Sequence, residues 1–184
     1  MSPSTSPLLV VQDANLLIDL HCGGLLACVF SPDTPWQVHV PDLILGELLR
    51  GTGPVAEALR PYQEEGRFIT GALDGSQVVE AVGIQIEQRR LSLEDCAAFV
   101  YARSNGGILL TGDNQLRTYA QSQEIPVHGT LWVLDQLVET WQVLPPADGH
   151  QALTRISSPA AGRRLPTAEC EARLARWQAT NASS

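Results

Sequence analysis

Lysine is absent from this chain of 184 residues, in which all 12 basic residues are arginine. The 20 acidic residues give a formal net charge of −8. A protein that holds nucleic acid by general electrostatic attraction needs clustered lysine and arginine, so the composition argues against that class. An enzyme that meets phosphate through a bound divalent cation escapes this argument, because the ion reverses the local field at its site.

Long apolar runs are also lacking, since none reaches the roughly 18 residues that a membrane-spanning helix needs. The N-terminus, MSPSTSP, has neither the basic start nor the apolar stretch of a signal peptide. We therefore expect a cytoplasmic protein. The cysteines show no CxxC spacing and no histidines at zinc-ligand intervals, so neither a zinc site nor a disulfide framework is indicated.

Short apolar segments alternate with segments of helical periodicity, and this order predicts the fold class. Several of the predicted strands are almost wholly apolar, as in parallel sheets that helices cover on both faces. The predicted class is α/β, with a parallel sheet in a three-layer α/β/α sandwich. The predicted strands are 8–11, 36–40, 68–69, 108–111 and 125–127, and the predicted helices are 14–20, 42–50, 54–65, 75–90, 92–103, 114–121 and 130–141.

The composition changes to glycine, proline, serine and arginine beyond Pro146. An amphipathic helix is predicted over 166–177, where Cys170, Leu174 and Trp177 share a face. The expected organisation is therefore one main domain over residues 1–145 and a C-terminal helical extension over residues 146–184. The end of the extension, residues 179–184, is expected to be disordered.

Two aspartates, Asp13 and Asp113, lie just past predicted apolar strands. The carboxyl ends of strands in an open parallel sheet are where ligand crevices form. Aspartate is also a favoured N-cap whose charge suits the helix dipole, so capping alone could explain either residue. Asp95 has the same alternative, because it falls three residues after Ser92 in the N3 place of a capping box.

Glu47 shares a face with leucine and isoleucine residues of the predicted helix 42–50. A carboxylate within an apolar stripe costs desolvation energy unless a cation meets it. The alternatives are a side chain that reaches solvent, or one paired with Arg50 or Arg117. If the four carboxylates converge, a hard divalent cation would relieve their repulsion, and oxygen-only ligation favours Mg²⁺ or Mn²⁺.

Four acidic segments resemble, in this order, those of PIN-domain ribonucleases. They are VQDANLLI at 11–18, Glu47, LEDCAA at 93–98 and LLTGDNQL at 109–116. The sequence IPVHGTL at 125–131 resembles the end of a subgroup related to VapC-type toxins. The resemblance covers about residues 8 to 140. Threonine or serine often follows the first aspartate in this family, whereas this chain has Ala14 there and retains Asn15.

The resemblance implies a PIN-like nuclease domain over residues 1–145, which would hydrolyse RNA with one or two Mg²⁺ or Mn²⁺ ions that activate water. The products would carry a 5′-phosphate and a 3′-hydroxyl. The subgroup implies the toxin of a toxin–antitoxin pair, with an antitoxin protein as partner and a homodimeric assembly. The implied catalytic and metal-binding residues are Asp13, Glu47, Asp95 and Asp113, and the substrate-orienting or supporting residues are Asn15, Thr111 and Asn114.

Two other function classes stay open at this point. One is a PIN-like module that binds RNA or protein without catalysis. The observation that distinguishes it from the nuclease is whether the four carboxylates lie close enough together to share a metal ion. The other is a phosphotransferase or phosphatase with Asp13 as nucleophile, which is disfavoured because it needs a lysine or an equivalent cation. Arg89-Arg90 and Arg163-Arg164 are the candidates for phosphate contacts, while Asp19 is expected on a solvated helix face.

Overall fold

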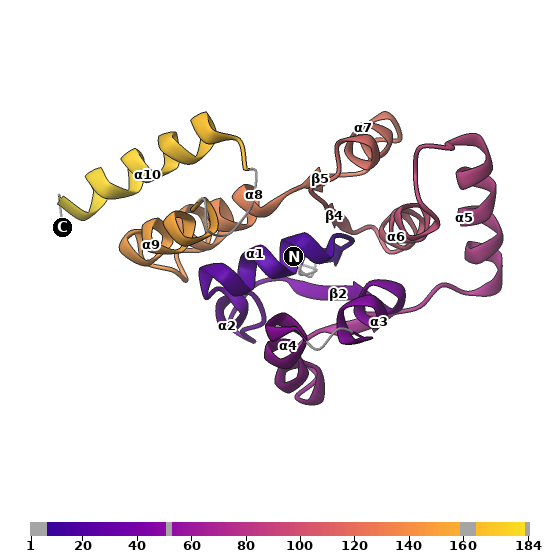
Figure 1. Ribbon diagram of the computed structural model, residues 1–184, viewed down its shortest axis with the longest axis horizontal. Coiled ribbons are helices and arrows are strands. Elements are labelled where there is room, and N and C mark those ends of the chain that lie inside the picture. The colour runs from indigo at the N-terminus through magenta and orange to yellow at the C-terminus, as the bar shows by residue number, and fades with distance from the viewer. Residues whose placement is uncertain (1–6, 51–52, 159–164, 183–184) are drawn as a thin grey trace, which may run out of the picture.

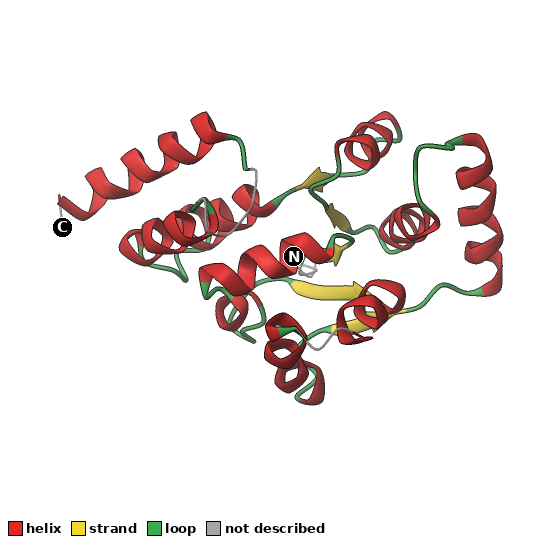
Figure 2. Cartoon of the chain, in the orientation of Figure 1, coloured by secondary structure: helices red, strands yellow, loops and turns green. Residues whose placement is uncertain are grey.

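Five parallel strands form a single sheet in the order β3-β2-β1-β4-β5, with helices on both faces (Figures 1 and 2). The computed structural model describes residues 7–50, 53–158 and 165–182, without the side chains of Glu47, Asn181 and Ala182. This is the predicted three-layer α/β architecture. The strands are β1 (Leu8–Val11), β2 (Gln37–Pro41), β3 (Ile69–Gly71), β4 (Ile108–Leu110) and β5 (Val127–His128).

Strand β1 lies at the centre of the sheet, between β2 and β4. Leu9 is in register with Val38 of β2 on one side and with Ile108 of β4 on the other. The chain leaves β1 toward β2 and later returns to the opposite side at β4, so the order of the strands reverses between β1 and β4. In open α/β sheets, the crevice beyond the carboxyl ends at such a point is the usual ligand site.

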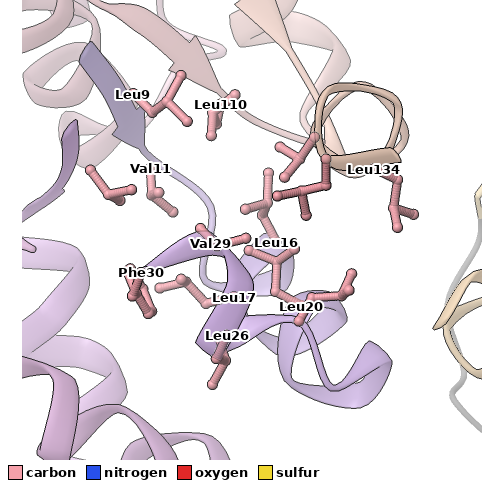
Figure 3. Packing of buried hydrophobic residues seen from close by; sticks show 14 of the residues in the cluster. Leu9, Val11, Leu16, Leu17, Leu20, Leu26, Val29, Phe30, Leu110 and Leu134 are labelled. Carbon is pink, nitrogen blue, oxygen red and sulfur yellow. The ribbon is translucent and has the colours of Figure 1, made fainter. Parts of the chain in front are cut away.

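The larger core lies on one face of the sheet. Figure 3 shows Leu9 and Val11 of β1 and Leu110 of β4 with the buried leucines Leu16 and Leu17 of the first helix. Burial of this apolar surface is the main stabilising contribution of the face. Its helical elements are α1 (Ala14–Gly23), α2 (Leu26–Val29), α4 (Pro54–Glu64), α8 (Thr130–Asp135), the π-helical η1 (Gln136–Thr140), α9 (Pro146–Ile156) and α10 (Thr167–Ala182).

The second core lies on the opposite face, because successive side chains of a strand point to opposite sides of a sheet. Val10 of β1 and Leu109 of β4 pack there with Phe99. The helices that cover this face are α5 (Gly75–Glu87), α6 (Leu93–Ser104) and α7 (Asn114–Ser122). Helix α3 (Asp42–Arg50) begins directly after β2 and contributes Ile44 and Leu45 to the larger core.

Every strand and helix expected from the sequence is present within a few residues of its predicted bounds, but α2 and α9 were not predicted. Helix α9 begins at Pro146, in the first-turn position where a missing N–H costs nothing. Its Leu153 and Ile156 are fully buried. Its buried residues, Gly149, Ala152, Leu153 and Ile156, follow helical spacing, but only two of them are large apolar side chains, so the signal in the sequence is weak.

Helix α10 packs on the same face as α9, and its Trp177 is 1% exposed within the larger core. Arg173 forms a salt bridge of 2.6 Å with Asp135. Residues 179–182, which were expected to be disordered, belong to this helix, while residues 183–184 lie outside the described part of the chain. The division into two units at residue 145 stays a prediction. No helix within the described ranges has the length and apolar character needed to cross a membrane.

Candidate functional site

Asp13 is held in the turn between β1 and α1. As the N-cap of α1, its Oδ1 accepts a hydrogen bond of 2.7 Å from the backbone N–H of Asn15. Its Oδ2 accepts a second bond, of 3.2 Å, from the backbone N–H of Gly112 beyond β4. This carboxylate therefore caps α1 and also lies at the edge of the sheet, so the two explanations for Asp13 do not exclude each other.

Asp113 occupies the equivalent position after β4. Its Oδ1 accepts 2.8 Å hydrogen bonds from the backbone N–H groups of Gln115 and Leu116, which makes it the N-cap of α7. No described residue donates a hydrogen bond to its Oδ2. The sheet order therefore brings Asp13 and Asp113 to adjacent turns, and the second of them keeps one carboxylate oxygen available for a ligand.

Gln12 links Asp95 to both central strands, and the sequence did not predict this role. Its side-chain Nε2 donates a bond of 2.6 Å to Oδ1 of Asp95, and its Oε1 accepts one of 2.7 Å from the hydroxyl of Thr111. The Thr111 hydroxyl in turn accepts a bond of 3.0 Å from the N–H of Asp113. The only signal in the sequence is a polar residue placed between an apolar strand and Asp13.

Asp95 also completes the predicted capping box of α6. Its Oδ2 accepts a bond of 2.8 Å from the N–H of Ser92, whose hydroxyl accepts one of 3.0 Å from the N–H of Asp95. Both of its oxygens therefore have hydrogen-bond partners. Asp95 reaches the Asp13 turn through Gln12 and does not itself line the cleft described below.

Glu47 lies in α3, but its side chain is outside the part of the chain that the structure describes. Among the side chains that are described, no group of three or more histidines, cysteines, aspartates or glutamates is placed to hold one ion. The convergence of Asp13, Glu47, Asp95 and Asp113 therefore stays a prediction.

The two carboxylates at these adjacent turns have donor atoms that suit a hard divalent cation. Asp13 and Asp113 offer oxygen donors alone, and Mg²⁺ and Mn²⁺ prefer oxygen ligands. Each carboxylate has about four lone-pair sites, so the capping bonds do not exhaust it. The turn is also closely fitted, because a Cβ atom on Gly112 would lie 2.9 Å from Oδ2 of Asp13.

A cleft of about 860 Å³ opens beyond the carboxyl ends of β1, β4 and β5. Its volume falls within the range of roughly 300 to 1,000 Å³ typical of ligand sites. The predicted orienting residues Asn15 and Asn114 line it, whereas Thr111 is fully buried. The opposite wall comes from α8 and from the C-terminal segment, with the lining residues Trp132, Asp135, Leu165, Pro166, Glu169 and Arg173.

The charged residues of the cleft differ from those expected. Asp19 is 5% exposed and accepts a bond of 2.9 Å from the Thr130 hydroxyl, so the expected solvated position is wrong. Its burial follows from the packing of α1 against α8. Arg117 lines the cleft, while Arg89 and Arg90 are exposed elsewhere. The pair at 163–164 lies outside the described residues.

Comparison with known proteins agrees with this fold. A family model described as a PIN domain matches residues 9–179, which include α9 and most of α10. A search of curated proteins gives no match. PIN domains are in general nucleases, which bind nucleic acid and typically use divalent metal ions. Since the match covers most of the chain, the protein belongs to the PIN-domain family.

Proposed function

We propose that the chain is a metal-dependent endoribonuclease whose centre is the pair Asp13 and Asp113. The observation that carries the proposal is their placement at the carboxyl ends of neighbouring strands, in turns joined through Gly112, with Asp13 lining an open cleft. This is the position in which an open parallel sheet binds its ligand. The all-oxygen donor set supports Mg²⁺ or Mn²⁺ as the cofactor.

Asp13 and Asp113 would hold the ion, with Glu47 and Asp95 as the further ligands that the family resemblance implies. When bound, the ion would supply activation of water and neutralisation of charge on the phosphodiester. The hydrogen bonds that Asp13 receives from Asn15 and Gly112 fix the orientation of its carboxylate.

The supporting residues act on the positions of those carboxylates. Thr111 and Gln12 form a buried chain of hydrogen bonds from the backbone of Asp113 to Asp95. Such a chain keeps the two turns in a fixed relation, which preorganises the site. Asn15 and Asn114 line the cleft, where their side-chain amides would orient the substrate.

The biological role that we propose, the toxin of a toxin–antitoxin pair in the cytoplasm, follows from the family resemblance. An antitoxin protein would then be a partner, and a homodimer the assembly. Helix α5 presents Val79, Val82 and Ile86 to solvent, and an exposed apolar face of this kind favours association.

The test is cleavage of a labelled single-stranded RNA by the wild type, Asp13→Asn and Asp113→Asn with Mg²⁺, with Mn²⁺ and with EDTA. Asparagine retains the N-cap, so the variants should fold while losing a charged oxygen ligand. We expect both to lose about 100-fold or more of the cleavage rate, and EDTA to abolish cleavage. A DNA strand of the same sequence tests the preference for RNA.

Asp74→Asn is the matched control, because Asp74 caps α5 and does not line the cleft. It should cleave at the wild-type rate. Equal cleavage by all the proteins would end the catalytic proposal. RNA binding by a wild type that does not cleave would favour the alternative of a non-catalytic module.

A further inference from the structure

His128 and Trp132 form a flat aromatic stack in the wall of the cleft. Their ring centroids are 4.3 Å apart and the ring planes differ by 6°. His128 ends β5 and Trp132 lies in the first turn of α8. Both residues are half-buried, and both line the cleft that contains Asp13. Each ring covers only one face of the other, so a planar group that enters the cleft can extend the stack.

The stack is uncharged near neutral pH. Burial and the nearby charge of Arg117 lower the pKa of His128 below its usual value of 6.5. A neutral imidazole on an indole offers an aromatic surface with hydrogen-bonding nitrogens at its edge. Nucleobases stack on such surfaces whatever their sequence, because every base has a π-face.

Arg117 adds a cation to the same part of the cleft. One of its guanidinium nitrogens donates a bond of 2.7 Å to the carbonyl oxygen of Thr111. A guanidinium carries five N–H donors, so most of them remain for a ligand. The described residues provide no carboxylate in a salt bridge with Arg117, in contrast to Arg173, which pairs with Asp135.

The backbone beside Arg117 leaves room for its side chain. A Cβ atom on Gly129 would lie 3.2 Å from the guanidinium nitrogen, closer than most such contacts. Glycine at this position therefore lets the guanidinium lie against the turn between His128 and α8. The arrangement brings a fixed cation and an aromatic stack together beside the Asp13 turn.

We propose that Arg117, His128 and Trp132 form a nucleotide subsite, in which an unpaired base stacks on the aromatic pair and Arg117 binds an adjoining phosphate. The inference deepens the proposed function, on which it rests, by naming the residues that would bind one unpaired nucleotide of the substrate. Bases inside a duplex already have both faces covered, so they cannot extend the stack. Arginine suits phosphate because its planar fork makes paired hydrogen bonds.

The first test measures binding without cleavage, with a labelled single-stranded RNA and the blunt duplex of the same sequence in EDTA. Trp132→Leu keeps an apolar side chain but removes the aromatic face. We expect it to weaken single-strand binding by roughly 5- to 150-fold, and Trp132→Phe to retain most of the affinity. Duplex binding should change little. Trp141→Leu, outside the cleft lining, is the control and should bind as the wild type does.

Arg117→Gln tests the phosphate contact through the salt dependence of binding. Loss of one phosphate contact should reduce the slope of log K against log salt concentration by roughly 0.7 for a single strand. Unchanged single-strand affinity in Trp132→Leu together with an unchanged slope in Arg117→Gln would overturn the subsite.

Tryptophan fluorescence provides a second readout that does not depend on how Trp132→Leu folds. Stacking of a base should quench the emission of Trp132, so the quench should disappear in Trp132→Phe and persist in Trp141→Phe. A quench that persists in Trp132→Phe would contradict the subsite. Absence of cleavage by the wild type would overturn the nuclease proposal alone, because neither binding readout requires catalysis.

Discussion

The backbone N–H of Gly112 donates a hydrogen bond of 3.2 Å to Oδ2 of Asp13, across 99 residues of sequence. The bond joins the turn after β1 to the turn after β4, where the strand order reverses. It depends on a glycine, because a Cβ atom at position 112 would lie 2.9 Å from the same oxygen. Glycine at position 112 therefore leaves the space that this carboxylate oxygen occupies.

Gly112→Ala should therefore reduce activity more than stability. The new methyl group meets the end of a side chain, which can move aside, so we expect the free energy of unfolding to change by about 1 kcal/mol or less. The displaced carboxylate should lower the RNA cleavage rate by about tenfold or more. Gly83→Ala is the control, because a Cβ there meets nothing within 4 Å. Full activity in Gly112→Ala would show that the position of Asp13 is not critical.

Gln12→Glu should destabilise the fold at neutral pH. The substitution replaces an amide that donates 2.6 Å to Asp95 with a second carboxylate in a site that is 8% exposed. We expect a loss of about 2 to 3 kcal/mol at pH 7 in urea unfolding. The like charges raise the pKa of the pair, so the loss should shrink as the pH falls and one group takes up a proton.

The exposed variant Gln121→Glu supplies the comparison for Gln12→Glu. Its free energy of unfolding should remain within about 0.5 kcal/mol of the wild type. Equal stability of the two variants would mean that the Gln12 bridge contributes nothing to the fold.

Trp177→Ala should destabilise the whole fold, not α10 alone. The indole is 1% exposed, and its Nε1 donates a bond of 2.7 Å to Glu139. Removing a buried tryptophan costs about 3 to 5 kcal/mol, which thermal or urea unfolding would detect. Trp141→Ala, at a tryptophan that is 38% exposed, should cost about 1 kcal/mol or less. If Trp177→Ala and Trp141→Ala unfold at the same midpoint, α10 does not belong to the cooperative folding unit.

His39 should make the stability depend on pH. Burial lowers its pKa below 6.5, and its Nδ1 lies 2.6 Å from the hydroxyl oxygen of Tyr101. As the pH falls through about 6.5, the unfolded chain takes up a proton that the folded histidine resists, so the free energy of unfolding falls. The fall ends below the folded pKa, where both states are protonated.

His39→Gln removes this linkage, so its stability should decrease less between pH 7.5 and pH 5.5 than that of the wild type. Urea unfolding at several pH values measures the difference. His128, whose pKa is also lowered, contributes equally to both proteins and cancels in the comparison. Parallel curves for the two proteins would contradict the assignment to His39.

The sequence alone determined the local features of this protein. The apolar run Leu8–Val11 predicts a buried strand, and the helical period after Asp13 predicts α1. Alternation of such units predicts a parallel sheet, whose strand ends place Asp13 and Asp113 at one edge. Ser92 and Asp95 predict their capping box, because the residues that form it are only three apart.

The tertiary structure decided what depends on the order of the strands and on packing. Gln12 meets Asp95 across 83 residues and Thr111 across 99, and no local pattern encodes such partners. Helix α9 is stable because α1 and α10 pack against it. Arg117 and Trp132 reach the Asp13 cleft because β4 lies beside β1 in the sheet and β5 lies beside β4. Periodicity reports which side chains share a face, whereas only the folded chain determines which faces meet.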